Sequence, residues 1–318
     1  KLFTGTEHSG AITTSNTLFM WGQNNKGTLG LGNNIDTSSP VQVGALTNWS
    51  EVSSGSYHSV AVKTDGTLWT WGYGNSGVLG DNTTVNKSSP VQIGSLTDWS
   101  KVSGGGRNTA AITTSGELYA WGYNTNGQLG DNTTVTKSSP VQVGSLTNWS
   151  QVSVGDGHSL AVKTDGTLWA WGRGFLGRIG DNTAVNKSSP VQIGALTNWS
   201  LVSAGSTHSI ALTTDGELYA WGQNSNGQLG LNDRVLRSSP VQVGSLTNWS
   251  QISARTNHTA AIKTNGTIWT WGYNGGRLGD NTTIRRSSPV QIGSETGWTS
   301  VASGPNSNHL LAAIGTTS

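Results

Sequence analysis

Six histidines recur at one position of a repeated sequence pattern, which raises the question of a metal site. They are His8, His58, His158, His208, His258 and His309. The ligands of one zinc ion lie within about 2 Å of it, but here no copy of a unit of about 50 residues supplies more than one histidine. We therefore predict a structural role, in which each histidine caps a turn beside a strand, and we expect no bound metal. Asn108 in the third copy is compatible with such a cap.

Four aspartates lie in Gly-Asp-Asn-Thr tracts and could in principle bind calcium. They are Asp81, Asp131, Asp181 and Asp280. Each tract offers one carboxylate, whereas a calcium ion takes about six to eight oxygen ligands, several of them usually carboxylates. Leu31 and Leu231 occupy the same position in two other copies. Turn formation, for which Asp and Asn are well suited, is the better explanation.

The sequence holds few residues arranged for catalysis. It has no cysteine, no Gly-x-Ser-x-Gly nucleophile elbow and no phosphate-binding loop. The acidic residues that differ between copies, such as Glu7, Asp156, Asp233 and Glu295, lie in separate copies with no evident pairing. A hydrolase acting on glycans would need such a carboxylate pair. We therefore predict that the protein is not an enzyme and uses no cofactor.

The charge and hydrophobicity of the chain limit the kinds of partner that it is expected to bind. The net charge is +2 and 11% of residues are charged, so no strong field attracts nucleic acid or a membrane surface. No run reaches about 18 apolar residues, the length that suggests membrane insertion, and the lack of cysteine excludes disulfides. The chain begins with Lys1 and carries no signal-peptide pattern, so we expect a processed form or a piece of a longer protein. The expected partner is a protein or a surface glycan.

A unit of about 50 residues occurs six times in the sequence. The dipeptide Trp-Gly begins at Trp21, Trp71, Trp121, Trp171, Trp221 and Trp271. A fixed period of this length indicates a repeat architecture in which neighbouring units pack on one another. We predict a single domain over residues 1–318, with repeats at 1–50, 51–100, 101–150, 151–200, 201–250 and 251–299 and a partial repeat at 300–318.

Each unit is predicted to form four short strands and no helix. In the second unit these cover residues 52–55, 58–63, 67–71 and 88–93. The Asp-Gly pair between the second and third strands is a strong hairpin signal. Pro90 in the fourth strand cannot donate a ladder hydrogen bond and therefore favours a sheet edge. Four strands per unit, repeated radially, are typical of a β-propeller blade.

The tail of the chain sets the number of blades. Residues 301–304 repeat the first strand and residues 309–313 the second, after a two-residue insertion around Pro305. The first strands end at Gly5, Gly55, Gly105, Gly155, Gly205, Arg255 and Gly304. We therefore predict an all-β, seven-bladed β-propeller built from six 50-residue repeats plus a partial seventh blade. Residues upstream of Lys1 would supply the missing outer strands, or residues 1–3, which resemble a third strand, would pair with the tail.

The order of motifs in each unit resembles one known repeat. Gly-x-x-His-Ser/Thr-x-Ala is followed by Asp/Ser-Gly-x-Leu-Trp/Tyr-x-Trp-Gly-x-Asn-x-x-Gly-x-Leu-Gly and then by Ser-Ser-Pro-Val-Gln. This pattern looks like the regulator-of-chromosome-condensation repeat, and the resemblance covers essentially the whole chain. It implies a seven-bladed propeller but leaves the function open, because a fold does not determine a function.

The family that this resemblance points to has members with different functions. The nucleotide exchange factor for a nuclear GTPase carries an added wedge, for which the repeats here leave no room. The plant ultraviolet photoreceptor uses clustered tryptophans and arginines, whereas the 15 tryptophans here are almost all explained by fixed repeat positions. The Ser/Thr/Asn-rich units look most like the bacterial and viral members, which implies an extracellular or virion-associated protein.

A specific function is best sought where the copies differ. The loops after the first strand and after Trp-Gly hold most of the non-repeated aromatic and arginine residues, which are types that anchor interfaces. We predict a binding face formed by Tyr57, Tyr73, Arg107, Tyr123, Arg173, Phe175 and Arg178. Neutral drift of exposed loops is an equal alternative except at residues 173–178, where an exposed Phe-Leu pair needs a reason.

One repeat position carries a circle of positive charge. It holds Lys87, Lys137, Lys187, Arg237 and Arg286, with Arg234 and Arg285 beside them. Lysine on an outer edge strand protects a sheet against edge-to-edge aggregation. We favour this role over a site for a polyanion.

These observations predict a non-enzymatic binding or structural propeller that recognises a protein or glycan through its loop face. A part of a phage tail or fibre, or a secreted bacterial protein, fits this description. The alternative is an inhibitor or regulator of a partner enzyme, resembling the β-lactamase inhibitor or the GTPase regulator of the family. Both alternatives place recognition on the same face of the molecule.

Overall fold

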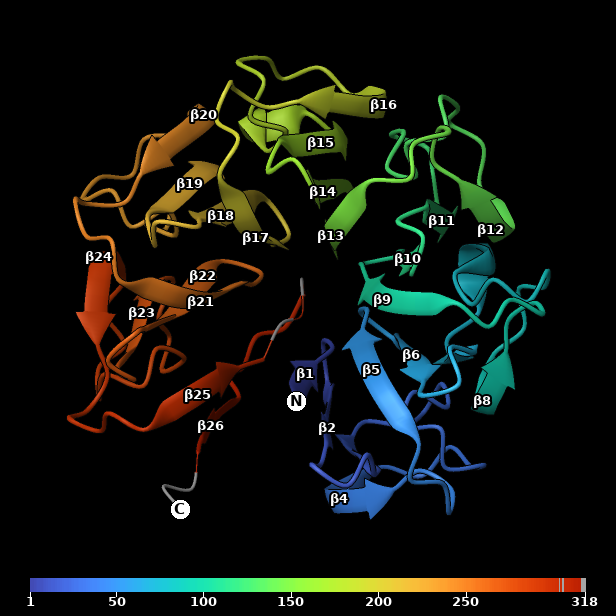
Figure 1. The fold of residues 1–318 in the computed structure, drawn as a ribbon. Helices are drawn as coiled ribbons and strands as arrows, with labels where there is room; N and C mark the ends of the chain where they lie inside the picture. Colours follow the sequence, from blue (N-terminus) through green and yellow to red (C-terminus); the bar gives the residue numbers. More distant parts are fainter. Residues whose placement is uncertain (303, 305, 316–318) are drawn as a thin grey trace.

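A computed structural model describes residues 1–302, 304 and 306–315 of the chain. In this part, 26 strands and two short 3-10 helices form, and the strands build six four-stranded sheets and one two-stranded sheet around a central axis (Figure 1). The predicted all-β, seven-bladed propeller is confirmed. No helix of the described residues has the length and apolarity needed to cross a membrane.

Strand order in the six four-stranded sheets follows the order in the chain, and all neighbours are antiparallel. The first strands, which lie toward the middle of the ring (Figure 1), are β1 (Leu2–Thr4), β5 (Trp49–Ser54), β9 (Trp99–Gly104), β13 (Trp149–Val154), β17 (Trp199–Ala204), β21 (Trp249–Ala254) and β25 (Trp298–Val301). The second strands are β2 (His8–Ile12), β6 (His58–Lys63), β10 (Asn108–Thr113), β14 (His158–Lys163), β18 (His208–Thr213), β22 (His258–Lys263) and β26 (Ala312–Ile314).

The third and fourth strands complete six of the blades. The third strands are β3 (Leu18–Gly22), β7 (Leu68–Gly72), β11 (Leu118–Gly122), β15 (Leu168–Gly172), β19 (Leu218–Gly222) and β23 (Ile268–Gly272). The fourth strands, at the rim of the ring (Figure 1), are β4 (Thr37–Gln42), β8 (Lys87–Gln92), β12 (Lys137–Gln142), β16 (Lys187–Gln192), β20 (Arg237–Gln242) and β24 (Arg286–Gln291). Two 3-10 turns, η1 (Asn75–Gly77) and η2 (Phe175–Gly177), follow β7 and β15.

The second blade shows how closely the strands follow the sequence pattern. The predicted second strand coincides with β6, and Pro90 lies in β8 at the outer edge of the sheet, as its missing N–H requires. The first strand begins earlier than predicted, because Trp49 still pairs with Lys63 across an irregularity in the register. The strand pattern of one repeat therefore transfers to the other complete blades.

The hydrophobic core of the protein lies between successive blades. One cluster joins Phe3, Leu18 and Met20 of the first blade to Trp49 and Trp71 of the second. Equivalent clusters join each later pair of blades up to the pair formed by β21–β24 and β25–β26. Each sheet thus buries its apolar faces against its neighbours, as expected of a repeat protein.

One backbone carbonyl in each of the first five blades accepts two hydrogen bonds from the next blade. The carbonyl of Thr28 accepts from the indole Nε1 of Trp71 at 2.9 Å and from the hydroxyl of Ser59 at 3.1 Å. The same pair of donors reaches the carbonyls of Val78, Gln128, Arg178 and Gln228. These five tryptophan N–H groups are satisfied by the neighbouring blade and help to fix how the blades fit together, whereas the indole N–H of Trp49 and its repeats makes no hydrogen bond within the described residues.

Five of the six recurring histidines also join blades, which goes beyond the predicted turn cap, whereas the ring of His258 makes no hydrogen bond within the described residues. Nε2 of His58 lies 2.9 Å from the hydroxyl of Thr109, and Nε2 of His158 lies 2.8 Å from that of Ser209. The His58 ring also covers Gly55 of its own turn, where a Cβ would meet the ring at 2.0 Å. Asn108 is shorter and, within the described residues, its amide makes no hydrogen bond.

Arg255 joins the two ends of the ring. It takes the place of the glycine that ends most other first strands, and its side chain is fully buried. One terminal nitrogen donates to the hydroxyl of Thr4 at 3.0 Å and to the carbonyl of His309, and the other donates to the carbonyl of Ala302. The hydroxyl of Ser9 also lies 2.9 Å from Nε2 of His309.

The seam differs from the sequence prediction in two respects. Residues 2–4 do not pair with the tail, because β1 pairs with β2, with Leu2 opposite Ala11. The last strand covers Ala312–Ile314 and is shorter than residues 309–313 had suggested. Ser303 and Pro305, which the sequence analysis placed in the seventh first strand and at the insertion, lie outside the described residues. That residues upstream of Lys1 complete the seventh blade stays a prediction.

Arg255→Gly tests whether this arginine holds the seam. The substitution introduces the residue found at this position in all six other copies, but it removes the hydrogen bonds to Thr4, Ala302 and His309. We expect the free energy of unfolding in urea to fall by about 1–3 kcal/mol and hydrogen exchange in β26 to become faster. The control, Arg234→Ala at an exposed arginine, should stay within about 0.5 kcal/mol of the wild type. An unchanged exchange rate in β26 would contradict the role of Arg255.

The buried histidines predict how stability depends on pH. Burial is the main cause that lowers the pKa of His8 to about 4 and the pKa values of His58, His208 and His258 to about 3. The unfolded chain takes up protons on these groups below about pH 6.5, whereas the folded chain resists them. The contribution of the neutral histidines to the free energy of unfolding is therefore complete above about pH 6.5. It is lost as the pH falls toward their folded-state pKa values of about 4 and 3.

His58→Asn should reduce this pH dependence by about one proton. Asparagine already occupies the same position in the third copy, as Asn108, so the variant should fold. The measurement is the urea unfolding free energy of both proteins between pH 7.5 and pH 4.5. Identical slopes for the two proteins would show that His58 is already charged in the folded state.

Candidate functional site

The two variable loops of each blade lie on one face of the propeller. The backbone N–H of Tyr73 donates to the carbonyl of Tyr57 at 2.8 Å, and the N–H of Tyr123 donates to that of Arg107 at 2.9 Å. Gly72 has a φ of 103°, which favours glycine, and a Cβ there would lie 2.7 Å from the Tyr57 carbonyl. The equivalent bond forms in the other four complete blades. The loops after the first strand and after Trp-Gly therefore form one surface, called here the loop face.

A cavity of about 600 Å³ opens on the loop face near the axis. Three predicted binding residues, Tyr57, Tyr73 and Arg107, line it together with Glu7, Lys26, Asp156 and Asn306. The rings of Tyr57 and Tyr73 meet edge to face, with centroids 6.4 Å apart and an interplanar angle of 82°. The structure thus brings together side chains from five different repeats.

Charges of both signs surround the aromatic pair. The ammonium of Lys26 lies 5.8 Å from the centroid of the Tyr73 ring. Lys26 and Arg107 are balanced by Glu7 and Asp156, which line the same cavity. The cavity can therefore offer aromatic faces and hydrogen bonds to a ligand but no strong field of one sign.

Asn306 forms part of the cavity lining near the axis. Its Nδ2 donates to the hydroxyl of Ser56 at 2.6 Å and to the carboxylate of Asp156 at 2.9 Å. Its Oδ1 accepts a hydrogen bond from the hydroxyl of Ser206. One residue of the partial seventh repeat thus links three other blades across the centre of the ring.

Three further predicted residues lie on the loop face outside the cavity lining. Tyr123 stands beside Arg107, whose guanidinium lies 6.0 Å from its ring centroid. The guanidinium of Arg173 lies 5.3 Å from the centroid of Phe175, and Phe175 is 53% exposed. Arg173 and Phe175 therefore form a second exposed pair, on the fourth blade.

Arg178 does not belong to the exposed surface, and its prediction as a binding residue at that surface is wrong. The side chain is 2% exposed, and it donates to the carbonyls of Phe175 at 2.9 Å and Ser206 at 2.7 Å. Burial, followed by the positive charge of Arg173, lowers the pKa of Arg178 to about 10, so it stays charged at neutral pH. The position is structural in other copies too, where it holds the buried residues Thr28, Val78, Gln128 and Gln228.

Sequence reasoning missed several residues of this face. Glu7, Lys26 and Asp156 differ between copies and could have been selected by the same criterion as Arg107. Tyr273 occupies the repeat position of Tyr73, and Arg277 and Arg285 each lie 5.2 Å from its ring centroid. Asn306 follows the insertion in the tail, so aligning the repeats gave no signal for it.

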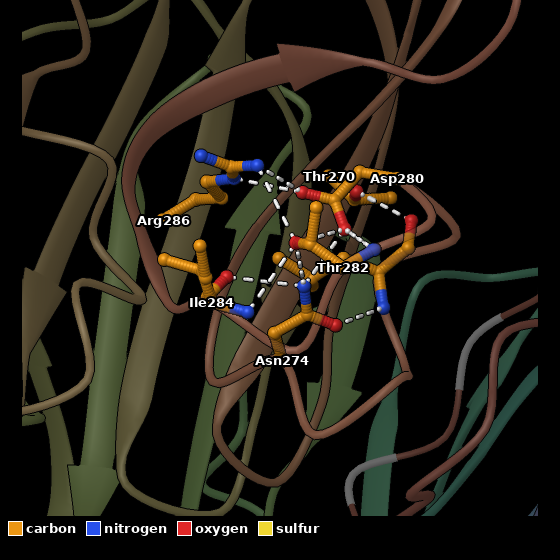
Figure 2. A network of polar contacts seen from close by, with 7 residues as sticks. Thr270, Asn274, Asp280, Thr282, Ile284 and Arg286 are labelled. Atoms are coloured by element: carbon orange, nitrogen blue, oxygen red, sulfur yellow. Dashed lines mark hydrogen bonds and ion pairs between the residues drawn. The ribbon is translucent and has the colours of Figure 1, made fainter.

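The Gly-Asp-Asn-Thr tracts form turns, as predicted. The carboxylate of Asp280 accepts hydrogen bonds from the backbone N–H of Thr282 at 3.1 Å and from its hydroxyl at 2.8 Å (Figure 2). Asn274 and Arg286 donate to the same carboxylate at 2.8 and 2.7 Å. Burial opposes ionisation here, but the hydrogen bonds of Thr282, Arg286 and Asn274 outweigh it and lower the pKa of Asp280 to about 2.

The circle of positive charge is paired within each blade. The ion pairs are Lys87–Asp81 at 3.2 Å, Lys137–Asp131 at 3.8 Å, Lys187–Asp181 at 3.0 Å, Arg237–Asp233 at 2.5 Å and Arg286–Asp280 at 2.7 Å. Each cation also begins the outer strand of its blade. Among residues 1–302, 304 and 306–315, no group of three His, Asp or Glu side chains is arranged to hold a metal ion.

Comparison with known proteins relates this fold to one repeat family. The profile of the regulator of chromosome condensation (RCC1) repeat matches residues 15–62, 65–112, 115–162, 165–212, 215–262 and 265–311. A second profile of the same repeat matches residues 49–78, 99–128, 149–178 and 199–228. No curated protein matches the sequence significantly.

Solved structures share the fold at low sequence identity. Prp20p of Saccharomyces cerevisiae superposes with a TM-score of 0.84 at 18% identity, over 98% of this chain and 81% of that chain. Yeast RCC1 (Prp20) bound to Kap60 gives 0.83 at 19%, over 96% and 78%. Human WBSCR16 gives 0.83 at 21%, over 99% and 88%. At such identities the likeness shows the fold alone.

Arg178 and Arg173 provide a matched test of the loop face. Arg178→Ala should lower the free energy of unfolding by about 1–3 kcal/mol, because it leaves the carbonyls of Phe175 and Ser206 without this donor. Arg173→Ala, at an exposed residue five positions away, should change it by no more than about 0.5 kcal/mol. Urea unfolding of both variants gives the comparison. Equal losses would mean that Arg173 is structural as well.

Proposed function

Because the chain belongs to the regulator of chromosome condensation (RCC1) repeat family, we propose that it is a non-enzymatic propeller that binds a partner protein through its loop face. The observation that carries the proposal is the cavity of about 600 Å³ in which Tyr57, Tyr73 and Arg107 meet. Tyrosine and arginine are prominent among the residues that supply most of the binding energy of protein interfaces. A concave site near the axis, presented by a rigid scaffold, suits such a role.

Two features favour a protein over a surface glycan. The exposed pair of Arg173 and Phe175 lies outside the cavity lining, so the loop face offers two separate anchors, which suit an extended protein surface. Among the solved relatives, yeast RCC1 (Prp20) was crystallised bound to Kap60, and Prp20p was studied for its binding to Gsp1p and histones. These partners belong to those proteins, and they support protein binding here only as a class.

The concave shape of the loop face suits the binding of a protruding segment of a partner protein. The residues after Trp-Gly form short turns, such as Asn75–Gly77 in the second blade, and they surround a hollow instead of projecting from the surface. A protruding segment of the partner would fill this hollow. This geometry favours reception of a segment over the alternative of an inhibitor that inserts a loop into an enzyme.

From the sequence, we propose that the protein has no catalytic activity, and we propose where it occurs. The acidic residues that vary between copies show no pairing, and the Ser/Thr/Asn-rich units look like bacterial and viral members of the family. We therefore propose a secreted or virion-associated protein. Neighbouring genes for virion components would support this setting, whereas a neighbouring gene for a β-lactamase or a GTPase would favour the regulator.

Tyr57→Ala and Arg107→Ala test the loop face. The partner captured by the immobilised wild-type protein from its native source should bind each variant more weakly by about 1–2 kcal/mol or more, as measured by surface plasmon resonance. Thermal unfolding should change little, since Tyr57 and Arg107 are exposed. Leu146→Ala, at an exposed residue beyond β12 and at the opposite end of the strands, is the control. A partner whose affinity depends on Leu146 but not on Tyr57 or Arg107 would refute the proposal.

A further inference from the structure

Three blades carry a buried lysine stacked against two tryptophans. The ammonium nitrogen of Lys63 lies 3.6 Å from the ring centroid of Trp69 and 5.0 Å from that of Trp49. Lys163 and Lys263 repeat this arrangement in the fourth and sixth blades, with distances of 3.7 Å and 4.9–5.0 Å. The third and fifth blades have threonine in place of the lysine and tyrosine in place of the outer tryptophan. Alternate blades therefore present a cation on an aromatic pair.

The ammonium groups of these lysines have unused hydrogen-bonding capacity. Lys63 is 6% exposed and Lys263 is 7% exposed, and within the described residues neither Nζ makes a hydrogen bond or ion pair. Burial lowers the pKa of both side chains, and for Lys63 the charge of Asp65 acts in the opposite direction. Asn265 replaces that aspartate beside Lys263. Each ammonium has three N–H donors, so an acceptor from outside could be bound.

Two of the lysines line grooves at the rim of the propeller. One groove of about 600 Å³ lies between the first and second blades, where Val41 and Leu46 face Trp49, Lys63 and Trp69. An equivalent groove of about 610 Å³ lies between the fifth and sixth blades. No acidic side chain lines either groove. The outer strands β4 and β20 form one wall of each, away from the central cavity (Figure 1).

A leucine distinguishes these two grooves from the interface that holds Lys163. Leu31 packs on the apolar cluster that contains Trp69, and Leu231 packs on the cluster that contains Trp269. The residue at this position beside Lys163 is Asp131, whose carboxylate is held by the hydroxyl of Thr133 and by Lys137. Leucine thus gives the two grooves an apolar wall, where Asp131 adds a negative charge.

We propose that the two rim grooves each bind a small hydrophobic carboxylate. Its apolar body would lie against the leucine, valine and tryptophan side chains, and its carboxylate would accept hydrogen bonds from Lys63 in one groove and from Lys263 in the other. The charges are complementary, because each groove presents a lysine that makes no ion pair within the described residues and has apolar walls around it. The volume lies within the range of about 300–1,000 Å³ usual for small-molecule sites. This activity is independent of the loop face.

Isothermal titration calorimetry with decanoate tests the proposal directly. The wild-type protein should bind two decanoate molecules per chain, and 1-decanol, which has the same chain length without the charge, should bind about tenfold more weakly or worse. Leu31→Asp should remove one site, and Leu31→Asp combined with Leu231→Asp should remove both. Aspartate already occupies this position in four other copies, so these variants should keep the wild-type unfolding temperature.

The lysines supply a second, matched comparison. Lys63→Gln combined with Lys263→Gln should weaken decanoate binding about tenfold or more, as expected for the loss of hydrogen bonds to a charged group. Lys163→Gln removes the same stacked cation from the interface that holds Asp131 and should leave binding unchanged. Any of three results would overturn the proposal: no decanoate binding by the wild type below its aggregation concentration, two sites retained in the folded double leucine variant, or equal weakening by Lys163→Gln.

Discussion

In each of the first five blades, a single backbone carbonyl accepts hydrogen bonds from the indole N–H and the hydroxyl of the next blade, and this contact determines how these blades are assembled. A tryptophan is large enough to fill the wedge between two sheets, and the indole N–H at the position of Trp71 finds its acceptor in the preceding blade. Thr28 provides that acceptor for Trp71 and Ser59, and four later blades repeat the arrangement. Because one atom accepts both donors, the relative position of two sheets is set by hydrogen bonds as well as by apolar packing.

The proposed binding surfaces arise where residues do not take part in the repeated contacts between blades. The loop face gathers Tyr57, Tyr73 and Arg107 because backbone hydrogen bonds hold the two variable loops of a blade together and leave their side chains in the lining of the cavity. The rim grooves arise differently, by a change at a repeated position: Leu31 stands where most copies have an aspartate. Variation in a repeat protein therefore creates sites either in loops or within the repeated framework.

The sequence predicted the fold well because its signals were local and repeated. Pro90 required a sheet edge, and β8 lies at one. The wrong prediction for Arg178 and the omission of Asn306 have physical causes that the sequence of one repeat does not reveal. The side chain of Arg178 turns inward because its position follows a glycine with a φ of 68° at the blade interface. Asn306 bonds to residues 100, 150 and 250 positions away, and such contacts follow from ring closure, which no local pattern encodes.

Near-identity of the repeats has a consequence for folding, because a blade from a second molecule can satisfy almost the same contacts as the blade beside it. Such exchange between chains is a known failure of repeat proteins. Arg255 counteracts it, since it binds Thr4 at one end of the ring and His309 at the other. These two partners occur together only when the first and last blades of a ring meet. Arg255 thus favours closure of the ring within one chain over exchange of blades between chains.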